Sequence, residues 1–498
     1  MPAVRSFAGA LRRTVFACAG VIGVLVAAAP AAATAATLTK ISSDPYTNSS
    51  SQHATEVEPD TFASGSTIVA AFQAGRFFSG GGSSNIGWAT STNGGTSWTS
   101  GFLRGLTTFA GGTYARVSDP SVAYDAKHNV WLIASLPISG STCCGAAVVV
   151  NRSTDGTTWS GPETVADTTT PGAGSNLDKN WIVCDNTPSS RFYGNCYVEW
   201  DDFGNADVIK LSTSNDGGLT WGPPRQTANA ATGLGGQPVI QPSGTVAVPI
   251  SNSNFTSILA FRSSDGGASW SSTQKVASIR AHAEAGNLRS QVLPSAEIDG
   301  GGKVYVVWQD CRFRRRCKAN DIVMKTSSDA VTWSAITRVP IDGTSSSVDH
   351  FLPGLGVDSA SAGSTARLAM TYYYYPSTRC STSTCRLDVG FISSSDGGQH
   401  WGPPIQLAGP MTNTWLANTD IGYMVGDYIS TSFVSNGTAH PVFAVANAPT
   451  GTTLAEAMYT PSTGLSPAAS ARATASGRPP VLSRTSSHPA PHQATARR

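Results

Sequence analysis

Short apolar stretches alternate with turn residues along most of this chain. Residues 304–308 read Val-Tyr-Val-Val-Trp and are apolar at every position. A strand of this kind has no polar face, so we predict that it is covered on both sides. Around it, residues 290–340 contain four short strand patterns separated by glycine, aspartate and serine. The predicted unit is therefore a four-stranded antiparallel sheet packed between neighbouring sheets.

A turn motif lies between the third and fourth strand patterns of each unit. Its clearest copy is Ser-Ser-Asp-Gly-Gly-Ala-Ser-Trp at residues 263–270. The glycines permit the positive φ of a tight turn, and the aspartate can accept backbone N–H groups across it. The tryptophan is expected to begin the fourth strand as an apolar anchor. Related stretches occupy residues 91–98, 153–159, 214–221, 327–333 and 394–401. We therefore predict that the aspartates of this motif are structural rather than catalytic.

The spacing of the motif defines the architecture. Its six tryptophans are 61, 62, 49, 63 and 68 residues apart, which indicates an array of like units. Repeated four-stranded sheets are typical of a β-propeller. After Trp401 three more strand patterns follow without the motif, and residues 37–46 can supply a fourth by pairing the two ends of the chain. We predict an all-β propeller of seven blades, with six blades as the alternative.

Both ends of the chain differ from this body. Residues 1–36 combine early arginines, an apolar run and an Ala-rich cleavage site, the pattern of a secretory signal peptide. Residues 461–498 are rich in Pro, Ser, Ala and Arg, and such a composition favours a disordered tail. The propeller is assigned to residues 37–460, and we expect it to be secreted.

Charge narrows the range of partners. The 498 residues carry a formal net charge of +2; without the three arginines of the leader and the five of the tail, residues 37–460 carry −6. A mildly acidic body is a poor candidate for nucleic-acid binding. No second apolar segment of spanning length follows the leader, so no membrane insertion is expected. We expect a monomer.

The cysteines form four pairs that are close in sequence. With Cys18 removed in the leader, eight remain, and an even number in an exported protein indicates disulfides. The spacing lacks the Cys-x-x-Cys and histidine pattern of a structural zinc site. The predicted pairs are Cys143–Cys144, Cys184–Cys196, Cys311–Cys317 and Cys380–Cys385.

The turn motif is that of the Asp box, or BNR repeat, and the chain resembles the sialidase-like Asp-box propellers over roughly residues 38–460. This resemblance implies a protein that acts on extracellular glycans, and at its most specific an exo-α-sialidase. Asp boxes also occur in non-catalytic proteins. The alternative is therefore a non-catalytic propeller that binds glycans or proteins on the face opposite the Asp boxes.

That face is expected to carry the connections between blades and the loops between second and third strands. A polar rim is normal for any exposed propeller face, which is the simpler interpretation of its charges. The charged residues of these segments are Arg76, Arg116, Asp119, Asp178, Lys179, Glu199, Asp201, Asp202, His282, Glu284, Arg289, Asp310, Arg312, Asp349, His350, Arg379, Asp420 and Asp427.

The resemblance to sialidases also implies roles for particular residues. In that family a tyrosine paired with a glutamate is the nucleophile and an aspartate handles the proton, an exception to the usual two-carboxylate scheme. On this pattern Tyr428 is the candidate nucleophile, Glu284 its partner and Asp119 the proton carrier. The alternative is that Tyr428 simply packs toward the central channel.

Three arginines grip the substrate carboxylate in sialidases, because the planar guanidinium matches a carboxylate with two hydrogen bonds. The candidates for this role are Arg116, Arg289 and Arg312. Arg312 lies in the basic loop Cys-Arg-Phe-Arg-Arg-Arg-Cys, for which a solvated loop is the alternative.

No cofactor is expected. The acidic residues 199–207 could hold calcium through several carboxylates, but they lack the EF-hand pattern, and an ordinary acidic loop is the simpler interpretation. The chain contains neither a Gly-x-Ser-x-Gly elbow nor a His-Glu-x-x-His motif.

Overall fold

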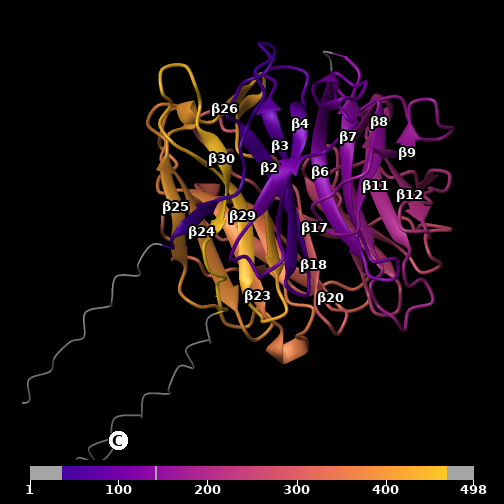
Figure 1. Cartoon of the computed structure of the whole chain (residues 1–498). Coiled ribbons are helices and arrows are strands. Elements are labelled where there is room, and N and C mark those ends of the chain that lie inside the picture. The colour runs from indigo at the N-terminus through magenta and orange to yellow at the C-terminus, as the bar shows by residue number, and fades with distance from the viewer. Residues whose placement is uncertain (1–35, 141–142, 468–498) are drawn as a thin grey trace, which may run out of the picture. The chain divides into compact units, whose positions relative to one another are not determined.

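The computed structural model describes residues 36–140 and 143–467 (Figure 1). The predicted signal peptide, apart from its last residue, and most of the predicted tail lie outside these residues. Within them the fold is all-β, with antiparallel pairing throughout the sheets. None of the helices in the described part is long and apolar enough to cross a membrane.

The described strands form seven four-stranded antiparallel groups and one two-stranded pair. The first two groups join into one larger sheet through a single pairing, Ser83 with Val117. These two groups are β2 (Glu56–Ser64), β3 (Thr67–Arg76), β4 (Ser83–Ser91) and β5 (Thr99–Phe102), and β6 (Arg116–Asp125), β7 (Val130–Ile138), β8 (Ala147–Ser153) and β9 (Glu163–Asp167).

The next four groups follow the same sequential order. They are β10 (Leu177–Cys184), β11 (Cys196–Asp202), β12 (Val208–Ser214) and β13 (Arg225–Gln226); β14 (Val239–Ile240), β15 (Val246–Ser251), β16 (Ser257–Ser263) and β17 (Gln274–Ser278); β18 (Ser295–Ile298), β19 (Val304–Asp310), β20 (Asp321–Ser327) and β21 (Thr337–Arg338); β22 (Asp349–Val357), β23 (Leu368–Tyr375), β24 (Leu387–Ser394) and β25 (Ile405–Met411).

The last group combines both ends of the chain. It contains β28 (Ser430–Phe433), β29 (Ala439–Ala446), β30 (Glu456–Pro461) and the N-terminal β1 (Leu38–Lys40). Leu38 pairs with Pro461 and Lys40 with Tyr459, which confirms the predicted pairing of the two ends. Beyond Pro461, Leu465 forms a further bridge with Ala439, so regular pairing continues into the first residues of the predicted tail.

The remaining elements are short. They are the hairpin β26 (Ala417–Thr419) and β27 (Gly422–Met424) and the 3-10 helices η1 (Thr108–Ala110), η2 (Phe203–Asn205), η3 (Arg315–Cys317), η4 (Gly363–Thr365) and η5 (Asn413–Trp415).

The first strands of the groups contact one another in chain order. β2 contacts β6, β6 contacts β10, and the series continues through β14, β18 and β22 to β28. β28 also contacts β2, so the series of contacts returns to its start. Strands β2 and β30, from opposite ends of the chain, lie side by side (Figure 1).

Strand β19 shows how the groups are held together. Val304, Val306 and Trp308 pack into a core shared with strands β14 to β17. Tyr305 and Val307, on the other face, pack into a core shared with strands β22 to β24. The prediction that this strand is covered on both sides is confirmed, because alternate residues of one strand enter two different cores.

The Asp-box turns connect third and fourth strands, as predicted. In the copy at 263–270, Asp265 Oδ1 accepts the backbone N–H of Ser269 at 3.0 Å and the hydroxyl of Ser263 at 2.8 Å. The Ser263 hydroxyl in turn accepts the N–H of Gly267 at 3.0 Å. One expectation is wrong: Trp270 precedes the fourth strand, which begins at Gln274. The turn is held by side chains, so ladder pairing starts only after it closes.

We expect Asp265→Ala to lower the free energy of unfolding by about 1–2 kcal/mol, because several backbone and hydroxyl donors lose their acceptor. Urea unfolding would measure the difference. Asp420→Ala removes an exposed aspartate outside the Asp boxes and is the control. Equal stability of the two variants would contradict a structural role for the box aspartate.

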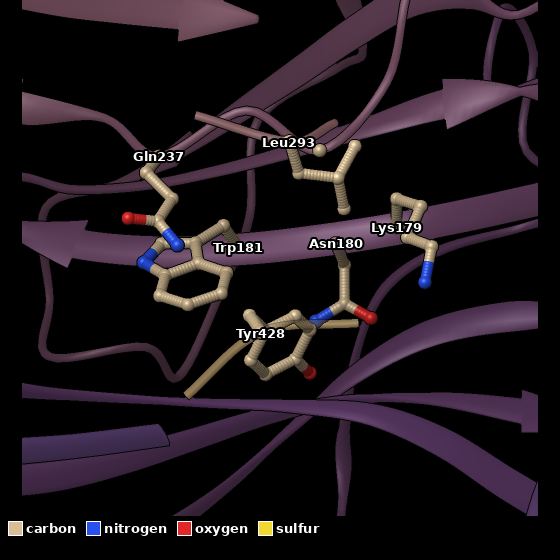
Figure 2. Close-up of a pocket in the computed structure, with 7 residues that line it drawn as sticks. Lys179, Asn180, Trp181, Gln237, Leu293 and Tyr428 are labelled. Atoms are coloured by element: carbon tan, nitrogen blue, oxygen red, sulfur yellow. The ribbon is translucent and has the colours of Figure 1, made fainter. Parts of the chain in front are cut away.

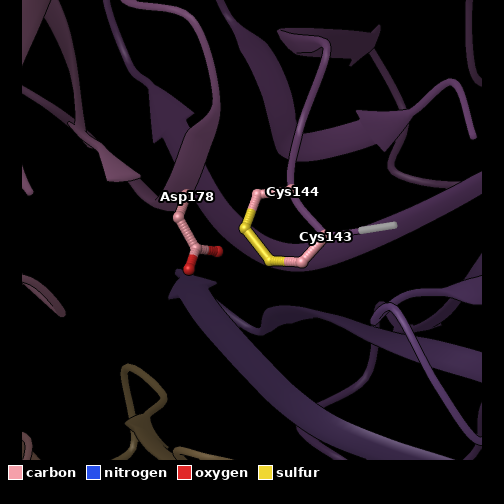
Figure 3. A group of neighbouring side chains, drawn as sticks. All are labelled: Cys143, Cys144 and Asp178. Atoms are coloured by element: carbon pink, nitrogen blue, oxygen red, sulfur yellow. A yellow bond between two sulfur atoms is a disulfide. The ribbon is translucent and has the colours of Figure 1, made fainter. Parts of the chain in front are cut away.

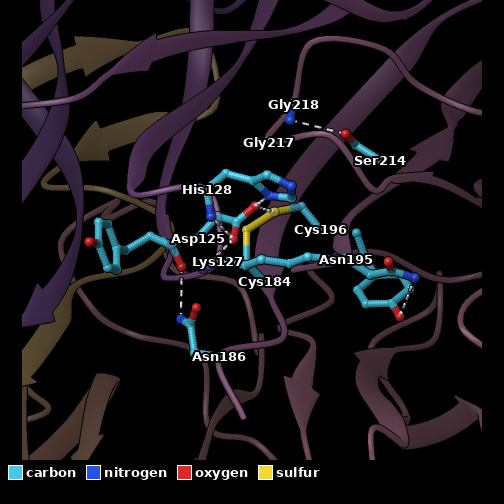
Figure 4. Close-up of a disulfide and its surroundings, with 12 residues drawn as sticks. Asp125, Lys127, His128, Cys184, Asn186, Asn195, Cys196, Ser214, Gly217 and Gly218 are labelled. Carbon is cyan, nitrogen blue, oxygen red and sulfur yellow. Dashed lines mark hydrogen bonds and ion pairs between the residues drawn. A yellow bond between two sulfur atoms is a disulfide. The ribbon is translucent and has the colours of Figure 1, made fainter. Parts of the chain in front are cut away.

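All four predicted disulfides are present: Cys143–Cys144, Cys184–Cys196, Cys311–Cys317 and Cys380–Cys385. Cys184–Cys196 joins the end of β10 to the start of β11 and lies beside the Asp125 and His128 turn of the preceding group (Figure 4). Each bridge spans at most 12 residues and therefore fixes a local connection rather than distant parts of the chain.

Candidate functional site

Four first strands share a bulge near their beginning. The register shifts between Val57 and Asp60 in β2, and at the corresponding places in β6, β10 and β22. At each bulge a residue other than glycine has a left-handed φ, an uncommon conformation that tertiary contacts must hold. These residues are Glu58 (φ 61°), Asp119 (φ 47°), Lys179 (φ 50°) and Leu352 (φ 48°).

Three of the bulges bring charged side chains together around the ammonium of Lys179. Its Nζ lies 3.4 Å from Glu58 Oε1 and 3.4 Å from Asp119 Oδ1. It also contacts the carboxylate of Asp427, which precedes β28. Arg289 donates to the same carboxylate from the other side, with Nε 2.8 Å from Asp427 Oδ1. We call these five residues the polar centre.

The polar centre contains two carboxyl groups with opposite protonation. Burial, followed by the charges of Asp119 and Asp427, raises the pKa of Glu58 to about 8 even though Lys179 opposes the shift. Burial also disfavours the charge of Asp427, but Arg289 and Lys179 outweigh it and hold its pKa below the usual range. At neutral pH Glu58 therefore keeps its proton while Asp427 is ionised.

Access to the polar centre is limited. Glu58, Asp119 and Asp427 are buried, whereas Arg289 is partly exposed. Asp178, the neighbour of Lys179, is also partly exposed, and its pKa is raised to about 7 by burial and by Asp119. Arg289 and Asp178 are the charged groups through which this region meets solvent.

Tyr428 lies next to the polar centre but is not free. Its hydroxyl donates to the carbonyl oxygen of Pro120 at 2.9 Å, and its ring packs against Trp181 with centroids 4.9 Å apart. Burial, and then the charge of Glu58, raises its pKa well above the usual value. The cavity beside it, shown in Figure 2 with Lys179 and Gln237, has a volume of about 10 Å³, room for roughly one water molecule.

Of the predicted site residues, the structure brings Asp119 and Arg289 together, with Tyr428 packed beside them. Glu284 lies elsewhere: its carboxylate accepts from Gln309 at 3.2 Å and Asn320 at 2.9 Å. Burial and the charge of Asp349 raise its pKa to about 8. In the described residues no hydrogen bond or ion pair joins Glu284 to Tyr428.

The three predicted arginines have separate partners. Arg116 donates to the carbonyl oxygens of Ser79 and Gly81 and covers the ring of Phe77. Arg312 is paired with Asp310 through two nitrogens. Arg289 is paired with Asp427. Across the described part of the chain, no contact links two of these three arginines to a common group.

A second arginine does lie near Arg289. Arg76, at the end of β3, is fully buried and donates to the carbonyl oxygen of Gly82. Burial, and then the charge of Arg289, lowers its pKa to about 10. Arg76, Lys179 and Asp427 belong to the charged rim residues identified from the sequence, but they were not assigned to the site.

Glu58 was missed altogether, although the sequence contains a signal for it. The bulge positions fall on a second repeat, a residue followed by proline near the start of each first strand. Successive copies lie 56 to 61 residues apart, except for the last interval of 75. The copies are Glu58-Pro59, Asp119-Pro120, Lys179-Asn180, Gln237-Pro238, Leu293-Pro294, Leu352-Pro353 and Asp427-Tyr428, with proline replaced in two of them.

Two groups of side chains have the composition of metal ligands. The sulfurs of Cys143 and Cys144 and the carboxylate of Asp178 lie within 4.8 Å of one another (Figure 3). Because these sulfurs form a disulfide, they are not the thiolates that a metal requires. The second group, Asp321, Asp342 and His350, has its carboxylates ion-paired with Arg314 and Arg338.

The acidic run considered for calcium is not a simple loop. Residues 199–202 belong to β11, and η2 follows directly. Burial raises the pKa of Glu199 to about 8 and that of Asp201 well above its usual value, with Asp178 adding to the second shift. Glu199, Asp201 and Asp178 are the residues of this run and its neighbourhood that could face a cation.

Comparison with known families matches residues 192–408 to the BNR repeat-like domain, a segment that contains four of the six Asp boxes. The chain is an Asp-box (BNR-repeat) protein. The resemblance inferred from the repeated turn motif is thereby confirmed. No curated protein matches the sequence.

Several solved structures resemble this BNR-repeat chain. A protein of unknown function from Dyadobacter fermentans is 16% identical over 72% of this chain and 99% of its own, with a TM-score of 0.46. NanB sialidase from Streptococcus pneumoniae is 14% identical over 84% of this chain and 70% of its own, with a TM-score of 0.40. A PL25 ulvan lyase is 10% identical over 87% and 97%, with a TM-score of 0.49. All three scores are below 0.5, so the fold description rests on the strand pairing of this chain.

Proposed function

We propose that this chain is a secreted seven-bladed β-propeller that binds extracellular glycans at the surface above its polar centre. The series of contacts between first strands, which returns from β28 to β2, supports the propeller and its seven blades. A ring closed by both chain ends also leaves no long unpaired edge.

The observation that carries the binding function is the convergence of both charge signs from four separate first-strand regions on Lys179 and Asp427. Convergent polar groups on rigid strands are the usual basis of ligand recognition. Arg289 and Asp178 are partly exposed there and can donate to and accept from sugar hydroxyls.

Binding is favoured over catalysis because the groups needed for sialidase chemistry are engaged elsewhere. The Tyr428 hydroxyl donates to a backbone carbonyl, and the arginines have separate partners. An exo-α-sialidase is the second candidate. The position of Tyr428 in the field of Glu58 and Asp119 supports it.

We expect Asp178→Asn to weaken binding of the recognised glycan about tenfold, which corresponds to about 1.4 kcal/mol. The secreted protein would first be screened on a glycan array, and the affinity of the best ligand would then be measured by calorimetry. Glu163→Gln, on the outer strand β9, is the matched control and should bind like the unaltered protein.

The same preparation distinguishes the second candidate. A panel of fluorogenic aryl glycosides that includes a sialoside would be incubated with the protein and with Tyr428→Phe. Turnover of the sialoside that disappears in Tyr428→Phe would establish the sialidase and displace pure binding. A folded protein that neither binds a glycan nor turns one over would refute both functions.

A further inference from the structure

A second cavity lies along the later halves of the first strands, away from the polar centre. Its volume is about 490 Å³, within the usual range for a small-molecule site. All seven first strands line it, and the turns that follow several of them, such as Asn186–Pro188 after β10, form one of its ends. Connections of this kind are the ones beside the Asp-box turns, as the backbone bond from Gly94 to Ser66 shows.

The charges that face this cavity have one sign. Its lining contains three acidic residues, Asp60, Glu297 and Asp299, and no lysine, arginine or histidine. Asp299 is fully used, because its carboxylate accepts from the backbone of Gly301 and Gly363 and from other donors of nearby turns. Asp60 and Glu297 are left to face the interior.

Asp60 and Glu297 are held on different strands. Asp60 Oδ2 accepts the N–H of Val122 at 2.7 Å, which fixes the carboxylate on β2. Within the described residues Glu297 on β18 has no side-chain partner, and the N–H of Ile298 is its hydrogen-bond donor. A cation between these two carboxyl groups would gain two acceptors that the protein itself leaves without a counter-charge.

The rest of the wall is suited to an organic body rather than to a metal ion. Phe62, Val183, Ile240 and Phe433 are all only half-buried and line the cavity. Calcium takes six to eight oxygen ligands and magnesium requires octahedral geometry. Two free carboxyl groups among apolar side chains do not provide that, whereas phenyl rings favour ammonium groups.

We propose that this cavity binds a small organic ammonium ion, with its charge between Asp60 and Glu297 and its apolar part against Phe62 and Phe433. Without a cation, burial and the charge of Asp60 raise the pKa of Glu297 to about 8, and burial raises that of Asp60 to about 7. A bound ammonium offsets this penalty by supplying the missing positive charge.

Calorimetric titration of the full-length secreted protein with benzylammonium chloride tests the proposal. Benzyl alcohol has nearly the same shape without the charge and serves as the matched ligand. We expect benzylammonium to bind at least tenfold more tightly than benzyl alcohol. Glu297→Gln should lose at least tenfold in affinity for benzylammonium, whereas Glu163→Gln on β9 should be unchanged.

Asp60→Asn provides a second variant should Glu297→Gln fail to fold, as judged by near-UV circular dichroism. Equal affinity for the charged and neutral ligands, or no binding of benzylammonium at millimolar concentration, would overturn the proposal. Calcium chloride that displaces benzylammonium stoichiometrically would assign the cavity to a divalent cation instead. None of these residues belongs to the polar centre, so the result is independent of the proposed glycan binding.

Discussion

Replacing Lys179 by methionine is expected to lower the free energy of unfolding by about 3–5 kcal/mol, the usual effect of removing one partner from a buried ion pair. The Lys179 ammonium contacts three buried carboxyl groups, those of Glu58, Asp119 and Asp427. Methionine keeps much of the side-chain volume, so the loss of charge dominates the effect. Urea unfolding at pH 8 would measure it.

Lysine 275 offers the matched control, because Lys275→Met removes an exposed ammonium on β17. We expect that control to change stability by less than about 0.5 kcal/mol. Lowering the pH should restore part of the stability of Lys179→Met, because protonation removes the uncompensated negative charges. A Lys179→Met variant as stable as the control would show that the polar centre is not the electrostatic hub described above.

The second large effect is a rise in stability as the pH falls from 8 to 6.5. Burial is the first cause of every shift in a set of carboxyl groups whose pKa is raised to about 7 or 8. These groups are Glu56, Glu58, Asp60, Asp178, Glu199, Glu284 and Glu297.

The sign follows from proton linkage. These groups titrate near pH 4 in the unfolded chain, so above that pH the folded protein holds more protons and loses stability as the pH rises through 7 and 8. If folding takes up two protons, the free energy of unfolding falls by about 2.7 kcal/mol for each pH unit of increase. Below pH 6.5, His350 and His440 oppose the trend, because burial lowers the pKa of each to about 4.

Urea midpoints at pH 8.0, 7.2 and 6.5 would measure this dependence. Glu199→Gln removes one of the titrating groups and should reduce the slope by up to about 1.4 kcal/mol per pH unit. A midpoint that stays constant or increases from pH 6.5 to 8.0 would contradict the burial of protonated carboxyl groups.

Local sequence patterns predicted much of the fold because they act over short distances. The apolar run 304–308 has no polar face, and β19 indeed contributes to two cores. The Asp-box turn is stabilised by contacts within its own eight residues, so its position between strands follows from its sequence. Cysteines close in sequence had few alternative partners, and all four pairs formed.

The candidate site was predicted less well, because its geometry depends on distant residues. The sequence identified Asp119 and Arg289, which do come together, yet it gave no sign that Arg116 and Arg312 would be paired with nearby groups of their own. Nothing local distinguishes an arginine that meets a backbone carbonyl from one that faces a ligand.

The sequence by itself determined the repeated four-stranded unit, the Asp-box turns, the disulfides and the pairing of the chain ends, since each is written in neighbouring residues or in a regular period. Only the tertiary structure decided that Glu58, Lys179 and Asp427 meet. Glu58 and Lys179 adopt a left-handed backbone that their residue types disfavour locally. Contacts between strands up to 248 residues apart in sequence hold them there, as the Lys179–Asp427 pair shows.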